Sequence, residues 1–388
     1  MTGRPFRTAL VGFGWINAQV WLPRLRAHRH FEVVGVYDPV LATRGRAAVG
    51  DHGLAPGSVA DRLEDLLAHD LDLVVVGTPN HLHEQTAGTF LDAGVAALIE
   101  KPLCLSTDEL GRLNARSWAT GTPFQISRPS ARRLDVDRLR SLVRQWCVGP
   151  VQVHAEWLRT SGVPRPGSWF TRRDQAGGGA LIDLGWHLAE VTHGLLPDPR
   201  RTSLTAELAF PTADSAQSGA RWRGDGPATD ALDGPDASPD GAVFDVEPDG
   251  RLLAHYRDGS SLTLRAAWAA DVDVDTTRVA VRGTGADGEE CHLELVTTFG
   301  FSPNRVTHPV LRVRRGDRSR QWPVETVPGK EYDAQLDSTL SMLRRNLPWR
   351  AELQSSAAVL ALLEDAYRVA GRPLVPEVPA RAAGAVPC

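Results

Sequence analysis

Short apolar runs alternate with amphipathic stretches over the first third of the chain. The runs fall at residues 8–12, 33–37, 71–77 and 95–100. Between the second and third runs, residues 61–69 carry leucines at helical spacing. Apolar runs connected by helices are typical of a parallel sheet that is covered on both faces. The pattern therefore predicts an N-terminal α/β domain over residues 1–125.

The pattern changes after residue 125. Short stretches of alternating apolar and polar residues are separated by turn signals such as Asp258-Gly259, which is typical of antiparallel strands. Helices precede and follow these strands, so we expect a second, α+β domain over residues 126–388 with an open, mostly antiparallel sheet. The expected helices lie at 134–146, 181–196, 332–345 and 353–370, and the expected strands at 151–158, 202–210, 251–256, 261–268, 277–283 and 291–297.

Residues 211–242 interrupt this second pattern. They are rich in Asp, Gly, Ala, Pro and Ser, and Trp222 is their only large apolar residue. We expect a flexible surface insert, with a lid or specificity loop as the alternative.

Composition and charge exclude several classes of protein. The net charge is -4 without a long block of one sign, so we expect no nucleic-acid partner. The apolar run at 71–77 has the length of a strand and is too short to span a membrane. Residues 1–6 lead directly into the first apolar run, so we expect no signal peptide. The four scattered cysteines fit a reducing compartment, so we expect a cytoplasmic protein.

Two glycines, Gly12 and Gly14, end the first apolar run. The first permits a tight turn, the second lets a pyrophosphate approach the backbone, and the next helix presents its N–H groups to the phosphates. Asn17 stands where a third glycine is usual, so we expect a slightly altered turn. Asp38 closes the second run and can accept hydrogen bonds from ribose hydroxyls, which favours NAD over NADP. A solvated turn residue is the alternative interpretation of Asp38.

A polar cluster, Thr78-Pro79-Asn80 with His83, directly follows the third apolar run. In open α/β sheets, ligands bind beyond the carboxyl ends of the strands. We therefore expect these residues to contact a dinucleotide, and an ordinary strand-to-helix turn is the alternative.

Glu100 and Lys101 close the fourth apolar run. Only two of the 43 basic residues are lysines, Lys101 and Lys330, so a lysine at a strand end indicates chemistry that arginine cannot perform. Its ammonium group can stabilise an alkoxide, and burial would lower its pKa toward the range of a proton carrier. A surface lysine is the alternative.

A glycine triplet at 177–179 precedes Asp183 and His187, which are four residues apart and so share one face of a helix. A histidine with a pKa near neutrality can take a hydroxyl proton during oxidation and return it during reduction. Asp183 can fix the substrate or orient the base. An incidental histidine is one alternative. A metal site is not expected, because the HExxH arrangement is absent although Glu190 and His193 lie nearby.

In this order, these motifs resemble those of the Gfo/Idh/MocA family of oxidoreductases, over about residues 5–200 and again at the helix near 353–372. The resemblance implies an N-terminal Rossmann domain and a C-terminal domain with an open sheet. It also implies that the exposed face of this sheet is the subunit interface of a homodimer or homotetramer. It implies NAD as the cofactor, with NADP possible, and catalytic roles for Lys101, Asp183 and His187. The cofactor contacts that we expect are Gly12, Gly14, Trp15, Ile16, Asp38, Thr78, Pro79, Asn80, His83, Glu100, Lys101 and Trp169, and the substrate contacts are Lys101, Arg128, Asp183 and His187.

We therefore expect a dehydrogenase that oxidises a secondary hydroxyl of a sugar, amino sugar, aminoglycoside or cyclitol to a ketone. His187 would be the general base and Lys101 would stabilise the alkoxide. Because family members serve antibiotic pathways, an aminoglycoside or other amino sugar is the preferred substrate. The alternatives are an NADPH-dependent keto-sugar or imine reductase and a non-catalytic dinucleotide-binding regulator.

Overall fold

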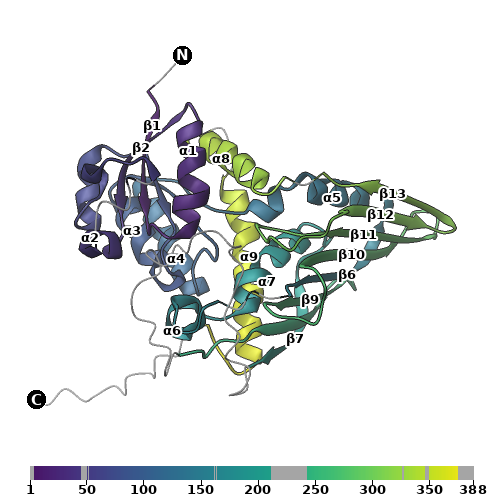
Figure 1. The fold of residues 1–388 in the computed structure, drawn as a ribbon. Coiled ribbons are helices and arrows are strands. Elements are labelled where there is room, and N and C mark those ends of the chain that lie inside the picture. The colour runs from purple at the N-terminus through teal and green to yellow at the C-terminus, as the bar shows by residue number, and fades with distance from the viewer. Residues whose placement is uncertain are drawn as a thin grey trace, which may run out of the picture.

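The computed structural model shows two β-sheets side by side, with helices around and between them (Figure 1). It describes residues 4–44, 50, 52–160, 162, 164–210, 243–325, 327–345 and 349–374. The insert expected at 211–242 lies outside the described residues.

The first sheet has five parallel strands in the order β2-β1-β3-β4-β5. They are β1 (Phe6–Val11), β2 (Phe31–Tyr37), β3 (Leu73–Val76), β4 (Ala96–Ile99) and β5 (Phe124–Ile126). Strands β3 and β4 are buried along their whole length, which is why the sequence shows them as unbroken apolar runs. The predicted parallel sheet is confirmed, and its strands all end at one edge.

The second sheet has eight strands in the order β13-β12-β11-β10-β6-β9-β8-β7. They are β6 (Val148–Leu158), β7 (Arg201–Ala209), β8 (Asp249–Tyr256), β9 (Ser261–Ala267), β10 (Thr276–Thr284), β11 (Glu290–Thr297), β12 (Val310–Arg315) and β13 (Arg318–Pro323). All pairings are antiparallel except that of β6 with β9, so the mostly antiparallel sheet is confirmed. Strands β12 and β13 were not predicted from the sequence. Strand β13 is exposed along almost its whole length, so it carries no apolar period.

Helices and both sheets share one large core, and a second core lies against the first sheet. The α-helices are α1 (Leu22–Ala27), α2 (Pro39–Arg44), α3 (His83–Asp92), α4 (Thr107–Thr120), α5 (Leu134–Trp146), α6 (Arg173–Ala176), α7 (Ala180–His193), α8 (Lys330–Leu343) and α9 (Trp349–Val369). Helix α9 lies between the sheets and contacts β5 and α4 on one side and α7 and β7 on the other (Figure 1). Helix α8 returns to the first sheet, where Leu336 and Leu340 join the core around Leu10 and Leu98.

The outer face of the second sheet carries charged side chains. Glu294 pairs with Arg278 and Arg312 across three neighbouring strands, and Glu156 lies 4.0 Å from Arg278. Obligate dimer interfaces are usually more apolar than this. The homo-oligomer expected through this face therefore stays a prediction.

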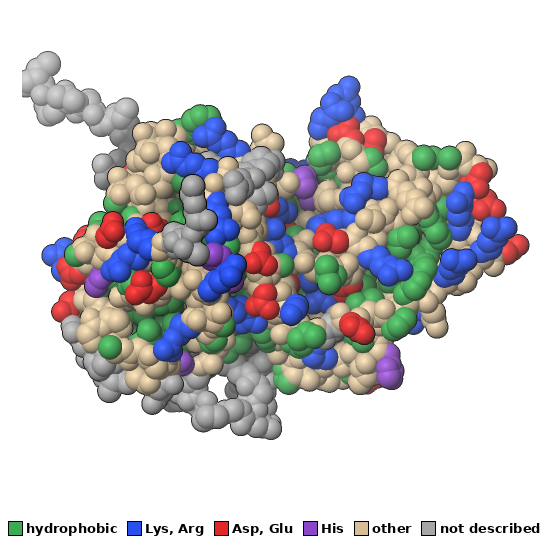
Figure 2. All heavy atoms as spheres, turned by 90° about the horizontal axis from the view of Figure 1, so that it is seen from above, with side chains coloured by type: hydrophobic (Ala, Val, Ile, Leu, Met, Phe, Trp, Pro, Cys, Tyr) green, Lys and Arg blue, Asp and Glu red, His purple; other side chains and the backbone are tan. Residues whose placement is uncertain are grey.

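Basic and acidic side chains are interspersed over the face of the molecule shown in Figure 2, without a wide patch of either sign. Within the described ranges, no helix combines the length and the apolar character that crossing a membrane requires.

Candidate active site

One cavity lies where the carboxyl edge of the first sheet faces α7 and the loop after β11. Ten of the residues predicted from the sequence line it: Trp15, Ile16, Thr78, Asn80, His83, Glu100, Lys101, Trp169, Asp183 and His187. The structure thus brings the polar clusters of two strand ends together with the expected acid–base residues of α7.

The glycine loop borders this cavity. Gly12 has φ +79°, and a Cβ there would lie 2.6 Å from the carbonyl oxygen of Gly77, so only glycine allows the loop to pack against the end of β3. A Cβ on Gly14 would meet nothing within 4 Å, which leaves room for a ligand. The helix begins as a π-helix over Ile16–Trp21. Within it, the buried amide of Asn17 donates to the carbonyl of Gly12 at 2.7 Å, so Asn17 fastens the loop from inside.

Two further observations show that this edge fits a dinucleotide. The hydroxyl of Thr78 is buried and has no hydrogen-bond partner among the described residues. Asp38 accepts a hydrogen bond from the backbone N–H of Phe13 at 2.7 Å, so its carboxylate lies directly beside the glycine loop. Burial raises the pKa of Asp38, and backbone N–H groups oppose that rise. Room at Gly14, an unpaired hydroxyl and an acidic group are the features that pyrophosphate and ribose require.

His83 connects two of the loops. Its Nδ1 lies 2.7 Å from the carbonyl oxygen of Pro102 and its Nε2 lies 2.9 Å from that of Thr78. Burial lowers the pKa of His83 to about 4. The neutral ring has one N–H and so donates to only one of these two carbonyl oxygens, while the ring itself lies buried between the loop after β3 and the loop after β4.

This burial predicts a pH-dependent stability. Unfolded His83 binds a proton below its ordinary pKa of 6.5, whereas the folded chain does so only near 4. Stability is therefore lost as the pH falls through this window, by about 1.4 kcal/mol per pH unit for this group. We expect the His83→Asn variant to lose this contribution to the slope of the free energy of unfolding against pH. Urea denaturation between the two pKa values measures it, and equal slopes in variant and wild type would contradict the assignment.

Lys101 and Asp183 form an ion pair across the cavity. Lys101 Nζ contacts Asp183 Oδ1, and the indole N–H of Trp268 donates to Oδ2 at 2.9 Å. Burial acts to raise the pKa of Asp183, but the Lys101 ammonium and the Trp268 indole hold it below its ordinary value. Since both carboxylate oxygens have partners, the geometry favours Asp183 as the residue that positions Lys101.

His187 is buried next to this pair, with 7% of its surface exposed. Its Nδ1 lies 3.1 Å from the Ser130 hydroxyl, and its ring lies 5.6 Å from that of Trp157. Burial lowers the pKa of His187 to about 3, and the charge of Lys101 acts in the same direction. The near-neutral pKa expected from the sequence is therefore not found. The ring is neutral and can accept a proton, but the imidazolium needs stabilisation.

The glycine triplet sets the position of α7. A Cβ on Gly179 would lie 2.0 Å from the carbonyl oxygen of Glu247, so the helix begins in direct backbone contact with that loop. The Glu247 carboxylate accepts the N–H groups of Gly179 and Leu181, each at 3.0 Å, and the hydroxyl of Tyr367. A buried anion at a helix N-terminus is stabilised by the helix dipole. These contacts anchor the helix that carries Asp183 and His187.

Glu100 supports the end of β4. Its carboxylate accepts the indole N–H of Trp21 at 2.8 Å and the backbone N–H of Lys101 at 3.1 Å. Burial raises the pKa of Glu100. The peptide bond between Lys101 and Pro102 is cis.

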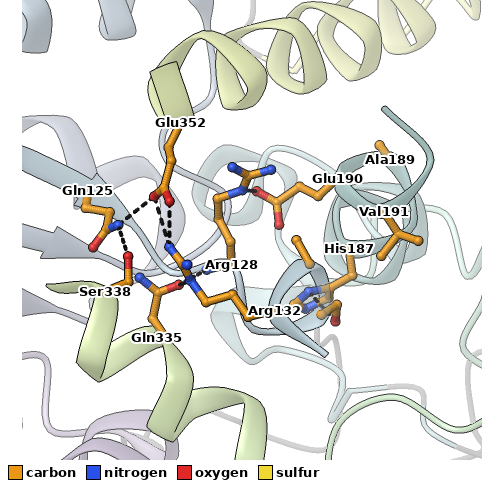
Figure 3. A network of polar contacts seen from close by, with 12 residues as sticks. Gln125, Arg128, Arg132, His187, Ala189, Glu190, Val191, Gln335, Ser338 and Glu352 are labelled. Carbon is orange, nitrogen blue, oxygen red and sulfur yellow. Dashed lines mark hydrogen bonds and ion pairs between the residues drawn. The ribbon is translucent and has the colours of Figure 1, made fainter. Parts of the chain in front are cut away.

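Arg128 is not brought to the cavity. Its Nε donates to Glu190 at 3.0 Å, and Figure 3 shows its side chain turned toward Glu190. The Glu190 side chain is fully buried, so breaking this pair would leave an uncompensated charge. The structure therefore gives no support to the expected contact between Arg128 and the substrate.

The opposite wall of the cavity was not predicted from the sequence. It is built by Trp157, Arg159, Phe299, Phe301, Ser302 and Tyr332, which come from the end of β6 and the residue after it, the loop after β11, and α8. No local motif marks these residues. Among the described residues, no group of three His, Cys, Asp or Glu side chains is placed to hold a metal ion.

A parallel nucleotide-binding sheet with a lysine at a strand end, facing a helix that carries Asp and His, defines the class of nicotinamide-dependent oxidoreductases with a separate substrate domain. Comparison with family models agrees. Residues 6–126 match the oxidoreductase family with an NAD-binding Rossmann fold, and residues 136–287 match the GFO/IDH/MocA C-terminal domain.

Known relatives extend the match over the whole chain. A protein of Amycolatopsis mediterranei, provisionally named UDP-kanosamine synthase oxidoreductase subunit, is 35% identical over 98% of both chains. D-glucoside 3-dehydrogenase of Escherichia coli is 30% identical over 53% of this chain and 58% of its own. The crystal structure of GenD2 from gentamicin A biosynthesis in complex with NAD has a TM-score of 0.71 at 26% identity, covering 96% of this chain and 95% of that one. The chain belongs to the Gfo/Idh/MocA family of oxidoreductases.

Proposed function

We propose that this protein oxidises a secondary hydroxyl group of a sugar to a ketone with NAD as the oxidant. The observation that carries the proposal is the convergence of Lys101, Asp183 and His187 on one cavity whose other edge fits a dinucleotide. The names of the relatives, which include a sugar dehydrogenase and a kanosamine synthase subunit, support the class of substrate.

In the proposed reaction the substrate hydroxyl lies between Lys101 and His187. Neutral His187 accepts the hydroxyl proton, and the Lys101 ammonium stabilises the negative charge that develops on the oxygen. A bound nicotinamide supplies the hydride acceptor. Asp183 keeps Lys101 in place through the ion pair.

The relatives rank the candidate substrates. The one that matches along the full chain is named for a UDP-linked amino sugar, and the glucoside dehydrogenase acts at position 3. We therefore place the 3-hydroxyl of a UDP-linked hexose ahead of the aminoglycoside expected from the sequence. Trp157 and Trp169 line the cavity, and aromatic side chains of this kind offer the flat apolar surfaces against which sugar rings pack.

The position of Asp38 favours NAD, because its carboxylate beside the glycine loop would repel a 2′-phosphate. We further propose a cytoplasmic homo-oligomer. The free thiols of Cys104, Cys147 and Cys291 support a reducing compartment.

A turnover screen tests the proposal. UDP-glucose, a methyl glucoside, an aminoglycoside and a cyclitol are each incubated with NAD and with NADP, and reduced nicotinamide is measured by its absorbance. We expect turnover with NAD on the UDP-hexose. Activity confined to reduction of keto-sugars by NADPH would favour the reductase alternative. Tight dinucleotide binding without turnover of any compound would favour the regulator.

A further inference from the structure

The hydrogen bond between Ser130 and His187 is the one contact of the His187 ring nitrogens that the structure defines among the described residues. Ser130 Oγ lies 3.1 Å from Nδ1, and both residues are buried, Ser130 with 4% and His187 with 7% of its surface exposed. We propose that Ser130 is a positioning residue that accepts the Nδ1 proton of His187 and so leaves Nε2 unprotonated toward the substrate. This inference rests on the proposed function, because it assigns the state of the proposed base.

The proton balance of the reaction requires this tautomer. A neutral imidazole carries one proton, on either Nδ1 or Nε2. If Ser130 accepts from Nδ1–H, the lone pair is on Nε2, and the hydroxyl proton of the substrate moves to Nε2 as the C–H hydride leaves. The imidazolium that forms keeps its Nδ1–H bonded to Ser130 Oγ. Ser130 neither gains nor loses a proton, and the hydrogen bond to it strengthens as the ring becomes charged.

A buried frame holds Ser130 in place from both sides. Ser130 belongs to a short 3-10 helix, Pro129–Arg132. On one side, Arg128 pairs with Glu190. On the other, Arg132 donates to Glu352 at 2.9 Å and to Gln335 at 2.7 Å (Figure 3).

This frame connects the short helix to three different elements. Glu190 lies on α7, one turn after His187, while Gln335 lies on α8 and Glu352 on α9. The backbone of Arg128 also donates to Gln335 at 2.9 Å. Because the ion pairs are largely buried, they are weakly screened and resist displacement of the short helix. The frame explains why Arg128 and Arg132 flank Ser130 without reaching the cavity.

The test combines single and double variants. We expect Ser130→Ala to lower kcat by roughly 10- to 100-fold, as for loss of one hydrogen bond to a group that becomes charged, with KM little changed. Ser130→Thr keeps the hydroxyl and should restore most of the rate. In a His187→Ala background, Ser130→Ala should have no further effect on kcat, because both changes act on one group. An equal loss in both backgrounds would overturn the inference.

Ser117→Ala is the matched control. Its hydroxyl is also buried and donates to the carbonyl of Thr122 at 2.6 Å. Ser117 does not line the cavity, and Thr122 precedes β5, at the edge of the first sheet opposite the carboxyl ends, so the kcat of this variant should match the wild type. A second readout needs no turnover. Nitrogen-15 NMR of the histidines, with His187 assigned by its absence in His187→Ala, should show a protonated Nδ1 in wild type and a mixed tautomer in Ser130→Ala.

These measurements separate two failures. Full activity of His187→Ala would reject the proposed base and with it the proposed reaction. A large loss in His187→Ala together with wild-type kcat and an unchanged tautomer in Ser130→Ala would reject the role of Ser130 alone.

Discussion

Replacement of His187 by alanine is expected to lower kcat by roughly 10²–10⁴-fold, the range that general-base catalysis contributes. The side chain lines the cavity and is neutral, and its contact with Ser130 uses Nδ1 and not Nε2. Steady-state kinetics with NAD and the best substrate of the screen measure the loss. Unchanged turnover in this variant would remove His187 from the mechanism.

The pH profile of the wild type provides the control for this assignment. A base acts in its deprotonated form, and burial together with the charge of Lys101 lowers the pKa of His187 to about 3. We therefore expect no fall in kcat/KM due to this group as the pH drops from about 7 to about 5. A protonation step of the free enzyme that disappears in His187→Ala would show instead that the ring titrates near neutrality.

Replacement of Lys101 by methionine is expected to lower kcat by roughly 10²–10³-fold, comparable to the loss of an oxyanion-stabilising donor. Methionine keeps an unbranched apolar stem and removes the charge that pairs with Asp183. Because Lys101 lowers the pKa of His187, the same variant should also show an acid limb displaced to higher pH. Kinetics across a pH series measure both effects.

Lys330→Ala is the matched control, since Lys330 is the other lysine of the chain and is exposed at the start of α8. It should have wild-type kcat. Lys101→Arg tests whether charge alone is sufficient, because a guanidinium is planar and larger than an ammonium. A Lys101→Met enzyme with undiminished kcat would contradict the proposed stabilisation of the alkoxide.

Much of this architecture could be predicted from local patterns. Buried parallel strands appear as apolar runs, so the sequence predicted β1 to β4 and the polar residues at their ends. Helical spacing likewise placed Asp183 and His187 on one face of α7. The less regular elements were harder to predict from the sequence. The stretch 61–69, expected as an amphipathic helix, is a 3-10 helix over Leu63–His69, because propensity does not distinguish the two.

Residue roles were less predictable than residue positions. The expected pKa of His187 was too high, because the depth of burial and the nearby charge of Lys101 depend on the folded cavity. The family resemblance suggested that Arg128 contacts the substrate, yet its partner is Glu190, on a helix that begins far along the chain. Trp268 and Ser130 carry no motif at all, although each contacts a predicted catalytic side chain.

The sequence by itself predicted the two sheets apart from β12 and β13, the dinucleotide edge, and Lys101, Asp183 and His187 as candidate catalytic residues, because periodicity and short motifs act over a few residues. Only the tertiary structure decided which groups these side chains meet. The ion pair of Lys101 with Asp183 and the hydrogen bond of Ser130 with His187 join residues 82 and 57 positions apart. Such contacts depend on how α7 is anchored by Glu247 and packed beside α9, and no local pattern encodes that packing.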